Sequence, residues 1–235
     1  DKVYFTANLM GSFSSDVPRY DALTETSGGT LKFRKWYYGP QNHLLASIKM
    51  RILEPSAIYD DATFITAWQR IDEDRYDQRL TSDWLSTSLV DVNVFSFTAD
   101  FNKGLANWPK HMFNYGFDLN HNNVASEAYA QHEDGTIDRE VNSRYPNEGS
   151  QYSSMGLFAG YKYKNTAENF TFDAGLRYSF SRLFAQFGPT GPIEWPAVYR
   201  AGIEANNQAG EISGLVAIPA DAAYVGNAIT LGGFF

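Results

Sequence analysis

Hydrophobic and polar residues alternate along most of this 235-residue chain. From Phe170 to Phe180, apolar or aromatic side chains occupy every second position, and small or polar residues fill the positions between them. A period of two puts the two sets on opposite faces of a β-strand, so the pattern predicts strands and not helices. The pattern recurs in stretches that span residues 2–13, 43–53, 62–71, 86–101, 110–121, 143–164, 170–182, 209–218 and 223–233.

The stretch from 86 to 101 changes phase near its middle. Its apolar residues stand at even positions up to Val94 and at odd positions from Phe95 onward. A shift of one position exchanges the two faces of a strand. We therefore expect either a β-bulge or a change of environment close to Val94.

The length of the stretches separates two classes of β-protein. Most of them cover about 9 to 13 residues, whereas strands of globular proteins usually have about 5 or 6. A tilted strand needs about 9 to 11 residues to cross a lipid bilayer. The lengths therefore favour an antiparallel transmembrane β-barrel over a soluble β-sandwich.

The connections between the stretches support the same class. Long and short connections alternate along the chain, as in outer-membrane barrels with longer extracellular loops and short periplasmic turns. The predicted long loops are 14–41, 72–85, 122–153 and 185–208, and the predicted short turns are 54–61, 102–109, 164–169 and 219–222.

In a membrane barrel the two faces of each strand meet different surroundings. Leu157 and the apolar residues on its side of the strand are predicted to face lipid, and Gly156 is predicted to face the lumen. Closure of the barrel pairs every backbone polar group within the bilayer. The charged residues predicted to line the lumen are Lys49, Arg51, Lys162, Asp173 and Arg177.

Aromatic residues make up 16% of the chain, which is a high share for a soluble domain. Many of them flank the predicted short turns, namely Trp108, Phe113, Tyr161, Tyr163, Phe170 and Phe172. Aromatic girdles at the membrane interfaces of a barrel account for this placement. The alternative is ordinary packing of aromatic residues in a soluble β-core.

Composition excludes several other classes of protein. The chain has no cysteine, so neither disulfides nor thiolate metal sites can form. Its net charge of -8 argues against a nucleic-acid partner, which needs a basic face. No apolar run reaches the length of about 18 residues that a transmembrane helix requires. The residues after Asp1 do not resemble a signal peptide, as expected for a mature protein or an internal fragment.

Several short segments, taken in order, resemble the barrel of TonB-dependent outer-membrane receptors. The closest group is the haem, haemoglobin and transferrin receptor type of Bacteroidota, and the resemblance runs from about Lys2 to Ser181. The segments are SSDVPRYDALTE (14–25), WYYGPQNHLLAS (36–47), AWQRIDEDR (67–75), VDVNVFSFTADF (90–101), YGFDLNHNNVASEA (115–128), SRYPNEGSQYSSMGLFAGYKYK (143–164) and GLRYSFS (175–181).

The resemblance implies a plugged barrel of about 22 strands in the bacterial outer membrane. Residues 1–235 would then form part of one β-barrel domain, with about nine of its strands. The plug domain and the other strands are not visible in this sequence. The implied partners are outer-membrane lipid and, through the rest of the receptor, the TonB complex.

The function implied by the resemblance is active import of an extracellular nutrient, with iron, haem or an iron carrier as the expected substrate. Energy for import would come from the inner membrane through TonB. Three alternatives stay open: a TonB-dependent importer of glycans or peptides, a passive porin, and a soluble β-sandwich binding module.

Two histidines are the candidate ligand-binding residues. His121 lies at the end of a predicted strand and His132 lies in the predicted loop 122–153. Either imidazole has the chemistry to meet haem iron. The alternative for both is a solvated surface histidine without a ligand.

No enzyme, cofactor or metal site is predicted. The sequence carries none of the usual nucleophile, zinc or nucleotide motifs. The acidic tract 131–140 lacks the regular spacing of a calcium loop, so a solvated loop tip is favoured over a calcium site. The acidic residues in 59–61 and 72–74 have the chemistry of glycosidase carboxylates, but charge beside strand ends is ordinary.

Overall fold

The computed structural model describes residues 2–138, 141, 143–165, 169–186 and 221–234. The predicted strand at 209–218 and nearly all of the predicted loop 185–208 lie outside these ranges. In the described residues the strands are β1 (Val3–Phe13), β2 (Val17–Pro18), β3 (Thr26–Ser27), β4 (Thr30–Leu31), β5 (Phe33–Ile52), β6 (Asp61–Arg79), β7 (Trp84–Leu105), β8 (Trp108–His132), β9 (Ile137–Asp138), β10 (Ser150–Lys164), β11 (Thr171–Gln186) and β12 (Asp221–Phe234), and the helix is α1 (Tyr20–Leu23).

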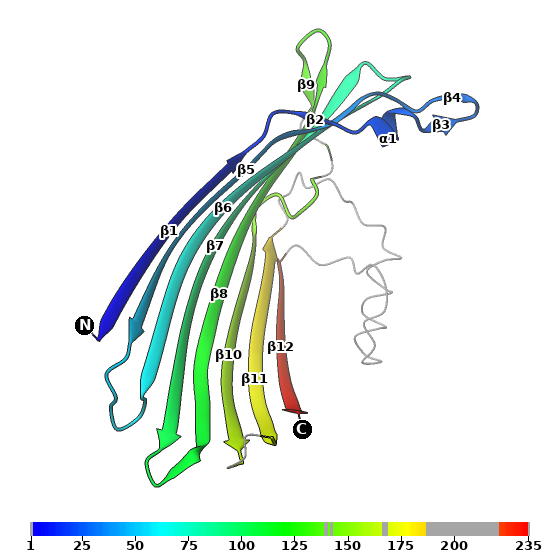
Figure 1. Ribbon diagram of the computed structural model, residues 1–235. Coiled ribbons are helices and arrows are strands. Elements are labelled where there is room, and N and C mark those ends of the chain that lie inside the picture. The colour runs from blue at the N-terminus through cyan, green and yellow to red at the C-terminus, as the bar shows by residue number, and fades with distance from the viewer. Residues whose placement is uncertain (1, 139–140, 142, 166–168, 187–220, 235) are drawn as a thin grey trace, which may run out of the picture.

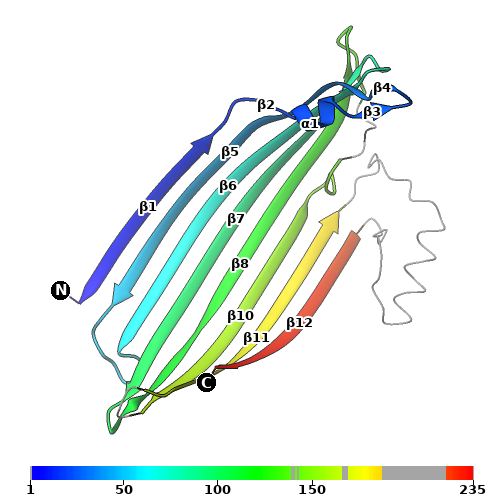
Figure 2. The same cartoon turned by 45° about the vertical axis from the view of Figure 1, so that its right-hand side comes forward.

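The long strands form one large antiparallel sheet in the order β1-β5-β6-β7-β8-β10-β11-β12. The short strand β2 adds to β5 and β9 adds to β8, while β3 and β4 form a separate hairpin. Figures 1 and 2 show the long strands side by side in a curved sheet. The predicted all-β fold, with antiparallel pairing of strands that follow each other along the chain, is confirmed.

The sheet does not close on itself. β1 and β12 are its two edges, and no pairing joins them in the described part of the chain. Every residue of β1 is exposed, as expected for an edge strand that has a neighbour on one side only. Among the described residues, no helix has the length and hydrophobicity needed to cross a membrane.

The central strands are longer than the alternation predicted, with 20 residues in β5, 19 in β6, 22 in β7 and 25 in β8. The predicted long loop at 72–85 is therefore wrong, because only residues 80–83 connect β6 to β7. Polar residues stand on both faces of these strand ends, so hydrophobic alternation did not detect them. Cross-strand contacts hold them instead, including the stacked rings of Tyr37 and Tyr76 at 4.8 Å.

The predicted loops 14–41 and 122–153 were also too long. β5 already begins at Phe33, and β8 continues to His132. The physical reason is the same, because cross-strand pairing extends both strands through sequence that lacks hydrophobic alternation.

The connections gather at two ends of the sheet, as Figure 1 shows. The loop end carries residues 14–32, 80–83, 133–138, 141 and 143–149, and with them the short elements α1, β2, β3, β4 and β9. The turn end carries residues 53–60, 106–107, 165 and 169–170. The short connection 80–83 breaks the predicted alternation of long and short connections.

The phase change near Val94 reflects a change of environment and not a bulge. The register of β7 with β6 and with β8 continues without a shift through Val94, and the only irregularity in β7 lies at Gly104 and Leu105. Apolar residues move to the other face of the sheet at this point. The two ends of the strand therefore meet different surroundings on the same face.

Candidate functional site

One face of the sheet, here called the apolar face, carries hydrophobic side chains across seven neighbouring strands. Residues directly opposite each other in an antiparallel pair point to the same side, so the register identifies the members of this face. One register row runs through Ala7, Ile48, Thr66, Phe97, Leu119, Met155 and Phe180. Leu9 is 78% exposed, Leu157 48% and Leu176 49%, so no described segment covers this face.

The band of apolar residues crosses the sheet diagonally at its loop-end limit. On β11 the band ends at Phe180, because Arg182 follows on the same face. Ala7 of β1 lies in the same register row as Phe180. On β1 the band continues six residues beyond Ala7 and ends at Phe13. The limit thus moves by about one residue per strand. With about 3.3 Å per residue and about 4.8 Å between strands, this shift corresponds to a strand tilt of about 35°.

The turn-end limit of the band shifts in the same direction. On β7 the last apolar residue of the band is Phe101. Lys103 follows on the same face, and its Nζ lies 2.6 Å from Oδ1 of Asp60. Leu176 of β11 lies in the same register row as Phe101 of β7. On β11 the band continues four residues beyond Leu176, to Phe172. Between β5 and β7 the turn-end limit stays in one register row, through Ile52, Ala62 and Phe101, and it shifts only from β7 to β11. The oblique loop-end limit is what tilted strands in a flat apolar layer require.

Aromatic residues gather at the turn-end limit of the band. Trp108 contacts His111 at 5.1 Å between ring centroids, and His111 contacts Tyr163 at 5.0 Å. The His111 Nδ1 lies 2.5 Å from the Tyr161 hydroxyl, and the Tyr161 ring also contacts Phe113. Residues from the ends of β8 and β10 that the sequence placed beside two different turns therefore form one cluster. Their role as a membrane girdle stays a prediction.

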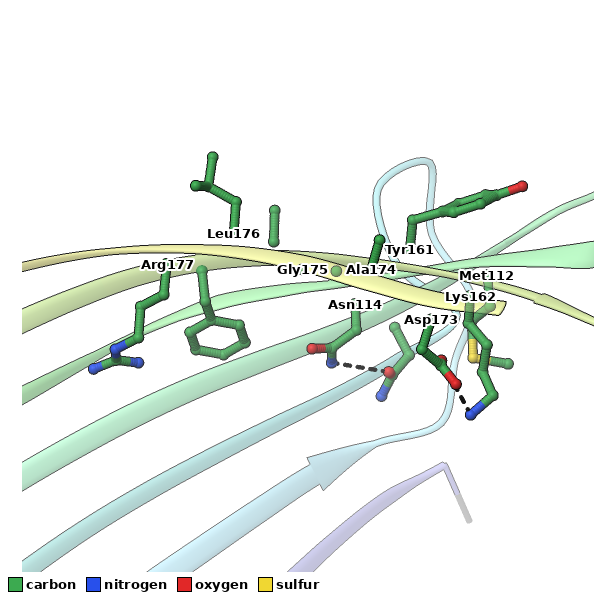
Figure 3. Close-up of a pocket in the computed structure, with 13 residues that line it drawn as sticks. Met112, Asn114, Tyr161, Lys162, Asp173, Ala174, Gly175, Leu176 and Arg177 are labelled. Atoms are coloured by element: carbon green, nitrogen blue, oxygen red, sulfur yellow. Dashed lines mark hydrogen bonds and ion pairs between the residues drawn. The ribbon is translucent and has the colours of Figure 1, made fainter. Parts of the chain in front are cut away.

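The opposite face, here called the polar face, carries the charged residues that the sequence grouped together. The register places Lys49, Arg51, Lys162, Asp173 and Arg177 on this face. Figure 3 shows Lys162, Asp173 and Arg177 on one side of the sheet, with Leu176 and Tyr161 on the other. The prediction that these five residues share one face is confirmed.

Side chains on the polar face lie flat against the sheet where glycines leave room. The Arg177 guanidinium crosses β10 above Gly156 and holds Asp118 with two contacts, at 2.7 and 2.9 Å. A Cβ at Gly156 would lie only 2.0 Å from Arg177 Nη2. The ring of Phe158 lies in the same way over Gly116, where a Cβ would come within 2.7 Å of its Cζ.

A cavity of about 550 Å³ opens beside the paired glycines Gly160 and Gly175. Asn114, Lys162 and Asp173 are among the polar residues that line it, and Lys162 pairs with Asp173 at 3.3 Å (Figure 3). A Cβ at either glycine would find no atom closer than 3.6 Å. No side chain covers the backbone at these two glycines, so a polar segment could approach the polar face closely here.

Replacement of Gly156 by alanine is expected to break the ion pair between Arg177 and Asp118. The added methyl group occupies the space of the guanidinium, and loss of the pair costs about 1 kcal/mol of unfolding free energy. Gly160→Ala is the matched control on the same strand, because its Cβ meets nothing closer than 3.7 Å. Urea unfolding of both variants in lipid vesicles measures the difference, and equal losses in the two would contradict the expectation.

A cluster of cations and aromatic rings lies at the loop end. The Trp36 side chain is buried, with the Arg19 guanidinium 4.4 Å and the Arg75 guanidinium 5.1 Å from its ring centroid. Tyr38 packs edge-on against Trp36 at 4.9 Å. The Arg75 Nε is buried without a hydrogen-bond partner in the described residues. The Arg19 guanidinium is already held by the Asp21 carboxylate, with Nε 3.1 Å from Oδ1. Arg75 is therefore the cation of the cluster that has an N–H donor to offer to an anionic ligand such as a carboxylate.

Sequence reasoning missed this cluster. Arg19 lies just before α1, whereas Trp36 and Arg75 lie at strand ends that the hydrophobic pattern assigned to loops. The backbone N–H of Arg19 donates to the Trp36 carbonyl at 3.0 Å, which brings the two together. No motif joins these residues along the chain, so no sequence signal was available to find them.

The two candidate histidines lie far apart and on opposite faces. His132 is on the polar face at the tip of β8, where its ring packs on Trp84 at 5.0 Å. His121 is on the apolar face, with Nδ1 2.8 Å from the Ser153 hydroxyl. Eleven residues of one strand separate them, or roughly 35 Å. They cannot hold one ligand together, and a ligand role for each stays a separate prediction.

The acidic tract from 131 to 138 is organised by local hydrogen bonds. The backbone N–H of Thr136 donates to Asp134 at 2.8 Å, and the His132 Nδ1 lies 3.0 Å from the same carboxylate. Hydrogen bonds from Thr136 and His132 lower the pKa of Asp134 to about 2. These contacts agree with the solvated loop tip that the sequence favoured. In the described ranges, no group of three acidic or histidine residues could hold a metal ion.

The acidic pairs considered as glycosidase carboxylates are engaged with basic residues. Asp60 pairs with Lys103 at 2.6 Å and Asp61 with Arg51 at 2.5 Å. Asp72 lies 3.1 Å from Arg70. The pair of Arg51 and Asp61 joins β5 to β6, whereas Arg70 and Asp72 pair along β6 itself, so these charges serve ion pairing within the sheet.

Comparison with known proteins does not identify a family for this chain. No protein-family model matches the chain, and no curated protein matches it. The arrangement of the two faces and of the loop end therefore carries the functional conclusion.

Proposed function

We propose that this sheet is part of the wall of an outer-membrane β-barrel. In this proposal the apolar face meets lipid, the polar face lines the lumen, and the loop end faces outside the cell. The protein is a TonB-dependent receptor that binds an extracellular nutrient and imports it with energy from the inner membrane. Iron, haem or an iron carrier is the proposed substrate class.

The diagonal apolar band is the observation that carries the membrane assignment. Its loop-end limit implies a tilt of about 35°, and strands of outer-membrane barrels are tilted by about 35–45°. On each strand the band is 7 to 11 residues long, for example Ala62–Trp68 on β6 and Val3–Phe13 on β1. About 9 to 11 residues of tilted strand cross a bilayer. A soluble sandwich needs a second layer over this face, and no described segment provides one.

The polar face supports a lumen that holds a plug. Arg177 and Phe158 lie flat over glycines, and the wall beside Gly160 and Gly175 is bare backbone. This arrangement leaves space at the wall while keeping charged groups paired within it, as with Arg177 and Asp118. A folded plug can then pack close to the wall through polar contacts.

The loop end supports nutrient binding from outside. Arg19, Trp36 and Arg75 form a preassembled cluster there, and Arg144 of the connection 133–149 pairs with Glu73 of β6. Carboxylate groups are common to haem and to many iron carriers, and the Arg75 guanidinium, which packs on Trp36, has the chemistry to bind one. Ligand-binding residues are typically held on loops by a rigid scaffold.

Energised uptake tests the transport function. Cells that depend on haem or a ferric iron carrier are expected to lose growth when the gene is deleted and to recover it on complementation. Collapse of the proton gradient is expected to abolish uptake of the radiolabelled iron compound, because import through a plugged barrel requires energy. Uptake that continues unchanged without the gradient would contradict active import and favour the passive porin.

A further inference from the structure

Three polar residues from adjacent strands stand in one row at the loop-end limit of the apolar band. Ser153 of β10 is the register partner of Arg182 of β11 and of His121 of β8. We call these three residues the boundary row. Arg182 and His121 are exposed. The next row toward the turn end on the same face consists of Phe180, Met155 and Leu119.

The boundary row carries a cation that nothing in the described structure neutralises. Arg182 has no ion-pair partner among the described residues, and no acidic residue stands in 119–123, 151–155 or 180–184. Arg70 on β6 lies at the same limit of the band, but it pairs with Asp72 and Asp91 at 3.1 and 2.5 Å. The positive charge of Arg182 on β11 is therefore available, whereas that of Arg70 on β6 is compensated.

The donors of the boundary row match a phosphate group. A guanidinium group presents a planar fork of N–H donors that fits phosphate oxygens bidentately. The His121 Nδ1 lies 2.8 Å from Ser153 Oγ. When that nitrogen donates, the serine hydroxyl is free to donate toward an anion beside Arg182. A charge-assisted site at the limit of an apolar band can hold the phosphate while acyl chains lie over Met155 and Phe180.

We propose that the boundary row binds the phosphate group of a phosphorylated lipid in the outer leaflet of the membrane. This inference rests on the proposed membrane function, because only an inserted sheet brings lipid headgroups to this row. The shared chemistry is a phosphate group, which a lipid or free inorganic phosphate could supply. The lipid source is favoured because the apolar rows begin directly beside the donors.

The test uses the full-length receptor in nanodiscs of phosphatidylcholine. A bisphosphorylated glycolipid is titrated in, and its affinity is read from native mass spectrometry. Loss of one charge-assisted hydrogen-bonding group is expected to weaken binding about ten-fold in Arg182→Gln. Arg70→Gln is the matched control at the same limit of the band, and its affinity is expected to stay within about two-fold of the wild type.

Two further arms distinguish the source of the phosphate. The dephosphorylated glycolipid is expected to bind without dependence on Arg182, because its headgroup lacks the anion. Inorganic phosphate is expected to compete only weakly, since it has no acyl chains to bury. Competition by inorganic phosphate at the affinity of the lipid would overturn the lipid assignment, as would equal lipid binding by Arg182→Gln and the wild type.

Insertion is measured separately, so failure of this inference can be told from failure of the proposed function. Single cysteines at Ser27, at the loop end, and Ala106, at the turn end, are labelled on intact cells. If Ser27→Cys is labelled and Ala106→Cys is not, but lipid affinity does not depend on Arg182, only the phosphate site is overturned. A receptor that does not enter the membrane overturns both.

Discussion

Leu157→Arg and Leu176→Arg are each expected to lower the unfolding free energy of the inserted receptor by about 2–4 kcal/mol. This is the cost of placing arginine on the lipid face of a barrel near the bilayer midplane. Both leucines lie within the diagonal band, and about half of each side chain is exposed in the sheet. Lipid would surround the new guanidinium in place of the leucine.

Ser154→Arg is the matched control, one register position from Met155 on β10 but on the polar face. In the proposed barrel its side chain meets the lumen, so the cost is expected to fall well below that of the leucine variants. Ser179→Arg is a less clean control, because Ser179 accepts a hydrogen bond from Arg177 Nε at 3.1 Å. Unfolding in bilayers measures all four variants. Equal losses of unfolding free energy for Leu157→Arg and Ser154→Arg would contradict the assignment of the lipid and lumen faces.

Residues 1–235 alone are expected not to form a stable monomeric barrel in lipid. The edge strands β1 and β12 are unpaired with each other in the described sheet, and each has an open row of backbone N–H and C=O groups. A backbone polar group without a partner in hydrocarbon costs several kcal/mol. Each edge therefore needs a pairing partner before the sheet is stable in a membrane.

Heat-modifiability on gel electrophoresis and protease resistance in detergent measure this outcome. The isolated chain is expected to migrate as an unfolded protein and to be digested, whereas the full-length receptor resists both treatments. The full-length receptor in the same detergent serves as the control for folding conditions. A compact, protease-resistant monomer made of these residues alone would instead indicate a small complete barrel.

The amino-acid sequence by itself determined the fold class and the facing of most side chains. Alternation with a period of two identified the strands that carry the apolar band, because burial against an apolar medium imposes that period. It also grouped Lys49, Lys162 and Arg177 on one face, which the register confirms. These properties depend on local sequence alone, since each strand presents its own two faces.

The sequence did not determine where the strands end or how far they extend. β6 and β8 continue well past their hydrophobic alternation, to Arg79 and His132. Beyond the apolar band, the ends of β6 and β8 lack a strong apolar alternation, so no hydrophobic period marks the strand. Backbone pairing with the neighbouring strands holds these ends, and pairing leaves no trace in the sequence of a single strand.

Only the tertiary structure decided which residues from different strands share a site. Arg177 reaches Asp118 across Gly156, although 59 residues separate the ion pair in sequence. The diagonal loop-end limit of the band and the boundary row likewise exist only after register is set. Register depends on cross-strand contacts along the whole length of a pair, and a shift by one residue would move every side chain to the other face.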